Sequence, residues 1–257
     1  MTGRQLIIGG VALGIISIVV MWQQKLFDGR EALPDFASYS QVGEKKQAFF
    51  NYLQPRVNKA NQQLRSERLK IVALKQALKS GTGSPGDLSA QPKAYLRQLA
   101  TRYRVPGRDD LNSLELLDQL LFRVDEIPPS LVLAQAANES AWGTSSFARN
   151  QLNLFGIWCY TENCGVIPKH RAEGATHQVA AFESVQACIE YYLLNLNSHP
   201  AYLDLRKLRA GLRQRQVTLS GVKLASGLLR YSERGQLYVD ELIEMIRFNN
   251  LDGLDEG

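Results

Sequence analysis

One carboxylate in the sequence has neighbours suited to chemistry: Glu139, in the segment LVLAQAANESAWGTS. This segment predicts a helix that ends near Glu139, with Val132, Ala136 and Trp142 on the same side. Apolar and aromatic neighbours disfavour the ionised carboxyl group and raise its pKa, as a general acid requires at neutral pH. Periodicity alone favours an ordinary helix-end glutamate over a catalytic one, so a catalytic role needs further evidence.

Cysteine and histidine residues form a second candidate group. Cys159 and Cys164 are five positions apart and could close a disulfide loop in an oxidising compartment. Cys188 has helical spacing with apolar neighbours and is predicted to be a buried thiol. A zinc site that adds His170 and His177 is disfavoured, because six residues separate these histidines and the usual spacing is three to five. We therefore expect no metal and no cofactor.

The composition allows one main domain with additional segments. The chain has 257 residues, of which 45% are hydrophobic, enough for a buried domain of roughly 150 residues. Its net charge of +5 favours anionic surfaces such as nucleic acid, lipid headgroups or the peptide carboxylates of a cell wall. Lys and Arg are scattered and do not form a stripe interleaved with aromatic residues, which argues against nucleic acid as the partner.

The N-terminal segment is directed to a membrane. An uncharged run extends from Leu6 to Trp22 and follows Arg4. No persuasive small-residue cleavage site comes after it, so residues 1–22 are predicted to be an uncleaved anchor, with a removed signal peptide as the alternative. With Arg4 inside, the rest of the chain would lie outside the cytoplasm, although basic residues soon after the run weaken this charge argument.

The next segments lead to the main domain. Residues 23–43 lack periodicity and are expected to form a tether. Residues 44–79 have helical spacing interrupted by Pro55, which predicts one or two amphipathic helices that pack on the domain. A loop rich in Gly, Ser and Pro completes this N-terminal region at 44–88. The main domain is placed at 89–257.

The main domain is predicted to be mainly helical. Four helices are indicated, near 114–124, 129–141, 185–197 and 239–246. The pieces VIPKH and HQVAAF flank the turn-like RAEGAT and predict a β-hairpin. The fold class is therefore α+β, with a small β-hairpin and an N-terminal membrane segment.

Four segments together resemble a known family. They are AANESAWGTS, NLFGIW, FESVQACIEYYLLNLNSHPAY and LLRYSERGQLYVDELI, and their order and spacing are similar to the glucosaminidase domain of bacterial autolysins and of the flagellar rod-associated muramidase. The loop NLFGIWCYTENCGVIPKHR more closely resembles the Bax-type branch, and the similarity extends upstream through KKQAFFNYLQP. The resemblance implies a lysozyme-like fold and cleavage of peptidoglycan at the β-1,4 bond after N-acetylglucosamine.

The resemblance also implies the site residues. It places the family's catalytic acid on Glu139, and it places Trp142, Asn153, Phe155 and Tyr231 at positions that line or support the substrate groove. Tyr231 lacks the family's usual Ala and Asp neighbours. Trp142 and Phe155 could instead be core aromatics, and Asn153 a capping or turn residue.

A second catalytic group is not evident. Glycosidases of this type normally use a second carboxylate or the acetamido group of the substrate. Family members carry Thr-x-Glu on the first hairpin strand, whereas this strand reads VIPKH. Glu162 and Glu173 are the nearest substitutes, and either could be a solvated surface charge.

Three functions follow as hypotheses. The preferred one is an endo-β-N-acetylglucosaminidase in the periplasm, anchored to the inner membrane. The alternatives are a lytic transglycosylase and a catalytically silent, membrane-tethered scaffold that binds peptidoglycan. The expected partners are peptidoglycan glycan strands and, through residues 1–22, the membrane; the sequence indicates no particular protein partner.

Overall fold

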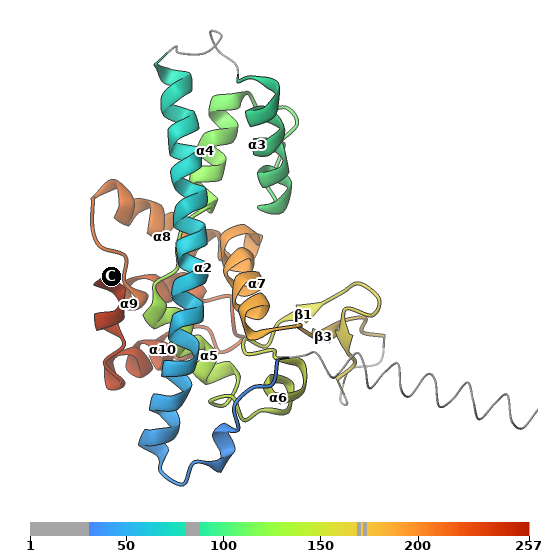
Figure 1. Cartoon of the computed structure of the whole chain (residues 1–257), viewed down its shortest axis with the longest axis vertical. Helices are drawn as coiled ribbons and strands as arrows, with labels where there is room; N and C mark the ends of the chain where they lie inside the picture. Colours follow the sequence, from blue (N-terminus) through green and yellow to red (C-terminus); the bar gives the residue numbers. More distant parts are fainter. Residues whose placement is uncertain (1–30, 81–87, 169–170, 172–173, 257) are drawn as a thin grey trace, which may run out of the picture.

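The protein is described here by a computed structural model that covers residues 31–80, 88–168, 171 and 174–256. These residues form a mainly helical structure with one small sheet (Figure 1). No helix in these ranges is both long and apolar enough to cross a membrane. The predicted anchor at 1–22 and the first part of the predicted tether, 23–30, lie outside the described residues.

A single long helix, α2 (Val42–Lys79), runs along the molecule (Figure 1). Its buried residues lie in one stripe against the rest of the domain: Phe49, Phe50, Leu53, Val57, Ala60, Asn61, Leu64 and Ile71. Pro55 lies within this helix at an exposed position and does not end it. One continuous helix therefore stands where the sequence predicted one or two.

The segment before α2 is not a tether in its described part. The short 3-10 helix η1 (Phe36–Ser38) buries Phe36, which is 1% exposed. The Glu31 carboxylate accepts a hydrogen bond from the backbone N–H of Val185 at 2.9 Å. The expected tether at 23–43 is therefore wrong from Glu31 onward. One buried ring and one carboxylate hold the segment on the domain, and neither contact produces periodicity in the sequence.

The other α-helices are α3 (Ala90–Arg102), α4 (Ser113–Arg123), α5 (Pro129–Glu139), α6 (Ser146–Gln151), α7 (Val185–Ser198), α8 (Leu203–Gln214), α9 (Gly221–Ala225) and α10 (Gln236–Phe248). Of these, α4, α5 and α7 pack against the long helix α2. Three more 3-10 helices are η2 (Pro200–Tyr202), η3 (Ser226–Leu228) and η4 (Asp252–Glu256). Helices α3 and α4 lie beside the upper half of α2 in Figure 1. The four predicted helices are present as α4, α5, α7 and α10.

Helix α5 is the central helix of the domain and packs on α2, α9 and α10. It begins at Pro129, where a proline costs no hydrogen bond because the first helical N–H groups have no partner within the helix. Every residue from Ser130 to Ala137 is buried. Such all-round burial leaves only the two ends of α5 partly exposed, at Pro129 and at Asn138 and Glu139.

The small sheet has three antiparallel strands in the order β1-β3-β2. They are β1 (Trp158–Cys159), β2 (Gly165–Val166) and β3 (Gln178–Ala180). The predicted hairpin corresponds to the β2–β3 pair, in which Val166 lies opposite Val179. Strand β1 was not predicted, since two residues are too few to show an alternating pattern. The mainly helical α+β architecture is confirmed.

Candidate functional site

A groove of about 1290 Å³ opens beside the C-terminal end of α5. Small-molecule pockets typically measure about 300–1,000 Å³, so this volume suits an extended ligand. Segments distant in sequence form its walls: the end of α5, the turn and strand at 155–161, helix α7 and the loop at 229–235. Its lining is rich in aromatic side chains, namely Phe147, Phe155, Trp158, Tyr160, Tyr191, Tyr202 and Tyr231.

Glu139 lines this groove as a half-buried carboxyl group. Burial raises its pKa above the usual value; the hydrogen bond from Tyr238 opposes this rise, the charge of Glu241 adds to it, and Arg234 opposes it. Arg234 is itself paired with Glu241 at 2.8 Å. A carboxyl group in such surroundings retains its proton to higher pH, which suits a general acid.

The two oxygens of Glu139 have different neighbours. Oε1 accepts a hydrogen bond from the Tyr238 hydroxyl at 2.8 Å. Oε2 faces Gly156, where an added Cβ would lie 3.4 Å from this oxygen. Gly156 has φ +61°, a left-handed conformation that favours glycine, and it also lines the groove. Oε2 is therefore the oxygen on the groove side of the carboxyl group.

Phe155 and Tyr231, two residues implied by the family resemblance, both line the groove. The Tyr231 hydroxyl donates to the backbone carbonyl of Phe155 at 2.8 Å. Its ring stacks on Tyr238 with centroids 5.6 Å apart, and the Phe155 ring stacks on Tyr192 at 3.9 Å. Phe155 is only 1% exposed, so it supports the floor of the groove, whereas Tyr231 is partly exposed to it.

Trp142, which the resemblance placed at a position that lines or supports the groove, is not among the residues that line it. Its ring packs edge-on against Phe49 and Phe50 of α2, with the Lys46 ammonium above it. Helix α5 ends at Glu139, and the left-handed backbone at Ala141 and Trp142 (φ 49° and 61°) turns the chain away. The helical spacing from Glu139 to Trp142 therefore does not persist. The alternative of a packing aromatic fits this position.

Asn153 is a turn residue in the structure and does not line the groove. It is 1% exposed, and its side-chain amide donates to the carbonyls of Ile157 and Ala180 at 2.8 and 2.9 Å. Its Oδ1 accepts from the N–H of Ile157 at 2.9 Å. These three bonds fix the NLFGIW turn against β3, so Asn153 supports the groove only indirectly.

Of the two predicted substitutes for the second carboxylate, only Glu162 lies among the described residues. Glu162 is exposed in the loop after β1 and is absent from the groove lining. Glu173 lies outside the described residues. Glu233, which the sequence analysis did not consider, does line the groove, on the loop before α10. Its position two residues after Tyr231, inside a motif already assigned to the site, was the available signal.

Two exposed aromatic residues of the groove were also not predicted from the sequence. Trp158 and Tyr160 line the groove and are 54% and 71% exposed. Trp158 stacks on His177 with ring centroids 4.2 Å apart, which fixes its plane. Exposed flat rings of this kind combine an apolar surface with a polar edge. They are therefore suited to pack against the faces of sugar rings.

A disulfide joins Cys159 to Cys164 and closes the loop that carries Tyr160. Gly165 directly follows this loop, and an added Cβ there would lie 1.9 Å from the Val179 carbonyl oxygen, so only glycine fits. Cys188 is buried, and burial raises the pKa of its thiol to about 12. In the part of the chain that the structure describes, no cluster of three or more His, Cys, Asp or Glu side chains could hold a metal ion.

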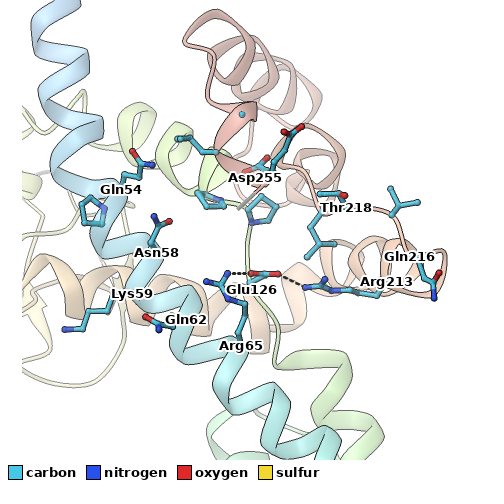
Figure 2. A pocket seen from close by; sticks show the side chains of 18 residues that line it. Gln54, Asn58, Lys59, Gln62, Arg65, Glu126, Arg213, Gln216, Thr218 and Asp255 are labelled. Carbon is cyan, nitrogen blue, oxygen red and sulfur yellow. Dashed lines mark hydrogen bonds and ion pairs between the residues drawn. The ribbon is translucent and has the colours of Figure 1, made fainter.

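A second hollow, of about 950 Å³, lies between α2, the segment before α5 and the C-terminal residues (Figure 2). Figure 2 shows Glu126 between Arg65 and Arg213, which contact its carboxylate at 2.6 and 2.7 Å. The Asp255 carboxylate there accepts from the Ser130 hydroxyl at 2.6 Å. Because both acids are already satisfied by donors of the protein, we assign the candidate active site to the Glu139 groove.

Comparison with known proteins identifies one matching family and two similar proteins. A family model for glucosaminidases, described as mannosyl-glycoprotein endo-beta-N-acetylglucosaminidase, matches residues 119–251. Protein bax of Escherichia coli strain K12 is 34% identical over 218 residues, which is 85% of this chain and 74% of that protein. The catalytic domain of the autolysin Auto from Listeria monocytogenes is 18% identical at a TM-score of 0.39, covering 70% of this chain and 97% of that one.

The chain therefore belongs to the glucosaminidase family. Within that family it belongs to the Bax-type branch, as its loop sequence indicated. The matched residues include Glu139 and all of the groove aromatics named above.

Proposed function

We propose that the protein is a glycosidase that cleaves the β-1,4 bond after N-acetylglucosamine in peptidoglycan. One observation carries this proposal: a half-buried Glu139, with a raised pKa and no ion pair to a cationic side chain among the described residues, lies in a large groove lined with aromatic rings. Its membership of the glucosaminidase family supports the same chemistry.

The first step is protonation of the leaving group. Glu139 donates its proton to the glycosidic oxygen as the bond from that oxygen to C1 breaks, so the leaving sugar departs as a neutral alcohol. Tyr238 remains hydrogen-bonded to Oε1 and stabilises the carboxylate that this step produces. Trp158 and Tyr160 supply surfaces on which the flanking sugars pack.

The acetamido group of the substrate is our proposed nucleophile. Its carbonyl oxygen attacks C1 as the leaving group departs, which forms a cyclic oxazolinium ion. Glu139, now ionised, accepts a proton from the water that opens this ring, so the acid is regenerated and the product has a reducing end. Glu233 is the alternative second group, since it is the only other acid among the described groove residues.

We also propose that the domain acts outside the cytoplasm, held at a membrane by residues 1–22. The uncharged run from Leu6 to Trp22 supports this proposal, and a disulfide between Cys159 and Cys164 is typical of an oxidising compartment. Sequencing the N-terminus of protein purified from membranes tests it. A mature N-terminus beyond Met21, or a fully soluble pool, would contradict the anchor.

Product analysis tests the proposed activity. Full-length protein in mild detergent is incubated with purified peptidoglycan, and the soluble fragments are identified by mass spectrometry, with Glu139→Gln as the inactive control. Fragments that end in reducing N-acetylglucosamine support the proposal. Anhydro-muramic ends identify a lytic transglycosylase instead. Glycan binding without fragments identifies a scaffold.

A further inference from the structure

A chain of three hydrogen bonds leads from the protein core to Glu139; the first two are buried and the last, to Glu139 itself, is partly buried. The Tyr192 hydroxyl on α7 donates to Gln135 Oε1 on α5. Gln135 Nε2 donates to the Tyr238 hydroxyl on α10 at 2.9 Å, and Tyr238 donates to Glu139 Oε1 at 2.8 Å. Gln135 is fully buried, and Tyr192 and Tyr238 are 1% and 2% exposed. Water therefore has little access to the bonds between Tyr192, Gln135 and Tyr238.

The chain has a fixed direction. The Gln135 nitrogen can only donate, so the single hydrogen of the Tyr238 hydroxyl must point elsewhere, and Glu139 is its acceptor. Rotating the Gln135 amide by half a turn would present its nitrogen to Tyr192. The Tyr192 hydrogen has no other acceptor among the described residues, and leaving it unsatisfied costs about 1–3 kcal/mol. Tyr192 thereby holds the amide in one orientation.

This direction determines which oxygen of Glu139 carries the acid proton. A proton on Oε1 would point at the hydrogen of Tyr238, and Tyr238 could not turn toward Gln135 because it would meet another donor. Protonation of Oε2 meets no such conflict. Oε2 is also the oxygen that faces Gly156 at the groove.

We propose that Gln135 is a positioning residue, which never touches the substrate and fixes the catalytic proton of Glu139 on the groove-facing oxygen through Tyr238. This inference rests on the proposed glycosidase function for its kinetic consequences. The hydrogen-bond chain itself predicts the titration of Glu139 in the absence of substrate. The two can therefore fail separately.

The first test is a pH titration of the full chain without substrate. ¹³C NMR of labelled glutamate carboxyl groups monitors the titration, and the signal of Glu139 is assigned by its loss in Glu139→Gln. Tyr238→Phe removes a hydrogen bond to the carboxylate and should raise the pKa of Glu139 by about one pH unit. Gln135→Met frees the Tyr238 hydroxyl to rotate and should raise that pKa by a smaller amount. The control Tyr103→Phe removes a similar tyrosine–carboxylate bond, to Glu67, and should leave Glu139 unchanged.

The second test is kinetic and uses the same variants on soluble peptidoglycan fragments. Gln135→Met should lower kcat roughly 10-fold with KM nearly unchanged, because the proton is no longer held in the reactive orientation. The basic limb of its pH–rate profile should move upward together with the NMR titration. A merely structural role would lower the amount of folded protein and leave the profile of the folded fraction in place.

The inference is overturned if Gln135→Met folds and retains both the wild-type Glu139 titration and the wild-type kcat. If Gln135→Met does not fold, Tyr192→Phe replaces it, since this change removes only the hydroxyl that orients the Gln135 amide. An unchanged Glu139 titration in folded Tyr192→Phe would equally overturn the inference. If the variants show the expected changes in the pKa of Glu139 but the wild-type protein releases no glycan fragments, the hydrogen-bond chain is supported and the proposed glycosidase function is contradicted.

Discussion

Two acids at opposite ends of α5 have opposite surroundings. Asp125, before the helix, is 2% exposed and contacts the guanidinium groups of Arg68, Arg209 and Arg213 at 3.6, 3.8 and 2.8 Å. Although burial alone would raise the pKa of Asp125, these arginines lower it below its usual value. Glu139, at the other end, has a neutral tyrosine hydroxyl on one oxygen and the groove beside the other.

Asp125 and Glu139 show that burial alone does not make a carboxyl group a general acid. Both carboxyl groups are withdrawn from water, and the sign of the pKa change depends on whether cations accompany them. Asp125 is thereby a permanent anion that joins α2, α8 and the segment before α5. Glu139 is left able to bind and release a proton.

The largest expected effect is on activity. Glu139→Gln preserves the shape of the side chain and has no proton to donate, so fragment release from peptidoglycan should fall by about 10²- to 10⁴-fold. The matched change Glu126→Gln, at the arginine-paired acid of Figure 2, should leave the rate within about twofold. If Glu139→Gln retained more than about a tenth of the parental rate, Glu139 would not be the acid.

The next effect is on stability. Asp125→Asn leaves the buried guanidinium of Arg209 without its anion, so the free energy of unfolding should fall by about 3–5 kcal/mol, measured in urea. The control Glu126→Gln breaks partly exposed pairs and should cost about 1 kcal/mol or less. Equal losses in the two variants would contradict the distinction between buried and surface pairs.

The same two acids predict opposite dependences of stability on pH. Because the pKa of Asp125 is lowered in the folded state, its stabilising contribution is present above the unfolded pKa and disappears as pH falls through the folded value. The pKa of Glu139 is raised, so folding loses stability as pH rises from the unfolded pKa through the folded one.

Thermal melts of Glu139→Gln test this sign. The variant should melt at a higher temperature than the wild type at pH 7, because pH 7 lies above the unfolded pKa of glutamate and the raised pKa of Glu139 in the folded state costs stability there. The difference should vanish below the unfolded pKa of glutamate, where both proteins carry a neutral group. A variant that melts lower than the wild type at pH 7 would show that ionised Glu139 is well stabilised and that its pKa is not raised.

The smallest effect is expected at Glu162. Its side chain is exposed in the disulfide loop and does not line the groove, so Glu162→Gln should change the hydrolytic rate by no more than about twofold. Glu233→Gln is the informative companion, since Glu233 does line the groove. If either variant loses as much activity as Glu139→Gln, the second catalytic group is that carboxylate and not the acetamido group of the substrate.

Periodicity predicted the parts of the fold whose burial pattern is local. Helices α4, α5, α7 and α10 follow from apolar spacing, and the position of Glu139 at the exposed end of α5 follows with them. The sequence predicted Trp142 on the same side as Glu139, but a left-handed turn after α5 ends the helical spacing. The residue types at this turn do not predict it.

Contacts between distant residues could not be predicted in this way. Asp125 pairs with arginines 84 and 88 positions away, and Tyr238 reaches Glu139 from 99 positions away. A single sequence carries no pattern that links such positions. The family resemblance supplied the acid itself, whereas the neighbours that determine its proton affinity required the structure.

If residues 1–22 anchor the protein as proposed, the segment that begins at Glu31 would limit how far the domain can reach from the membrane. Since residues from Glu31 onward are bound to the domain, only residues 23–30 separate it from the proposed anchor at 1–22. Even fully extended, this span covers roughly 28 Å at most. An anchored glycosidase would therefore cut only glycan strands close to the membrane surface. Lengthening the segment at 23–30 should extend the depth of cell wall that it can digest.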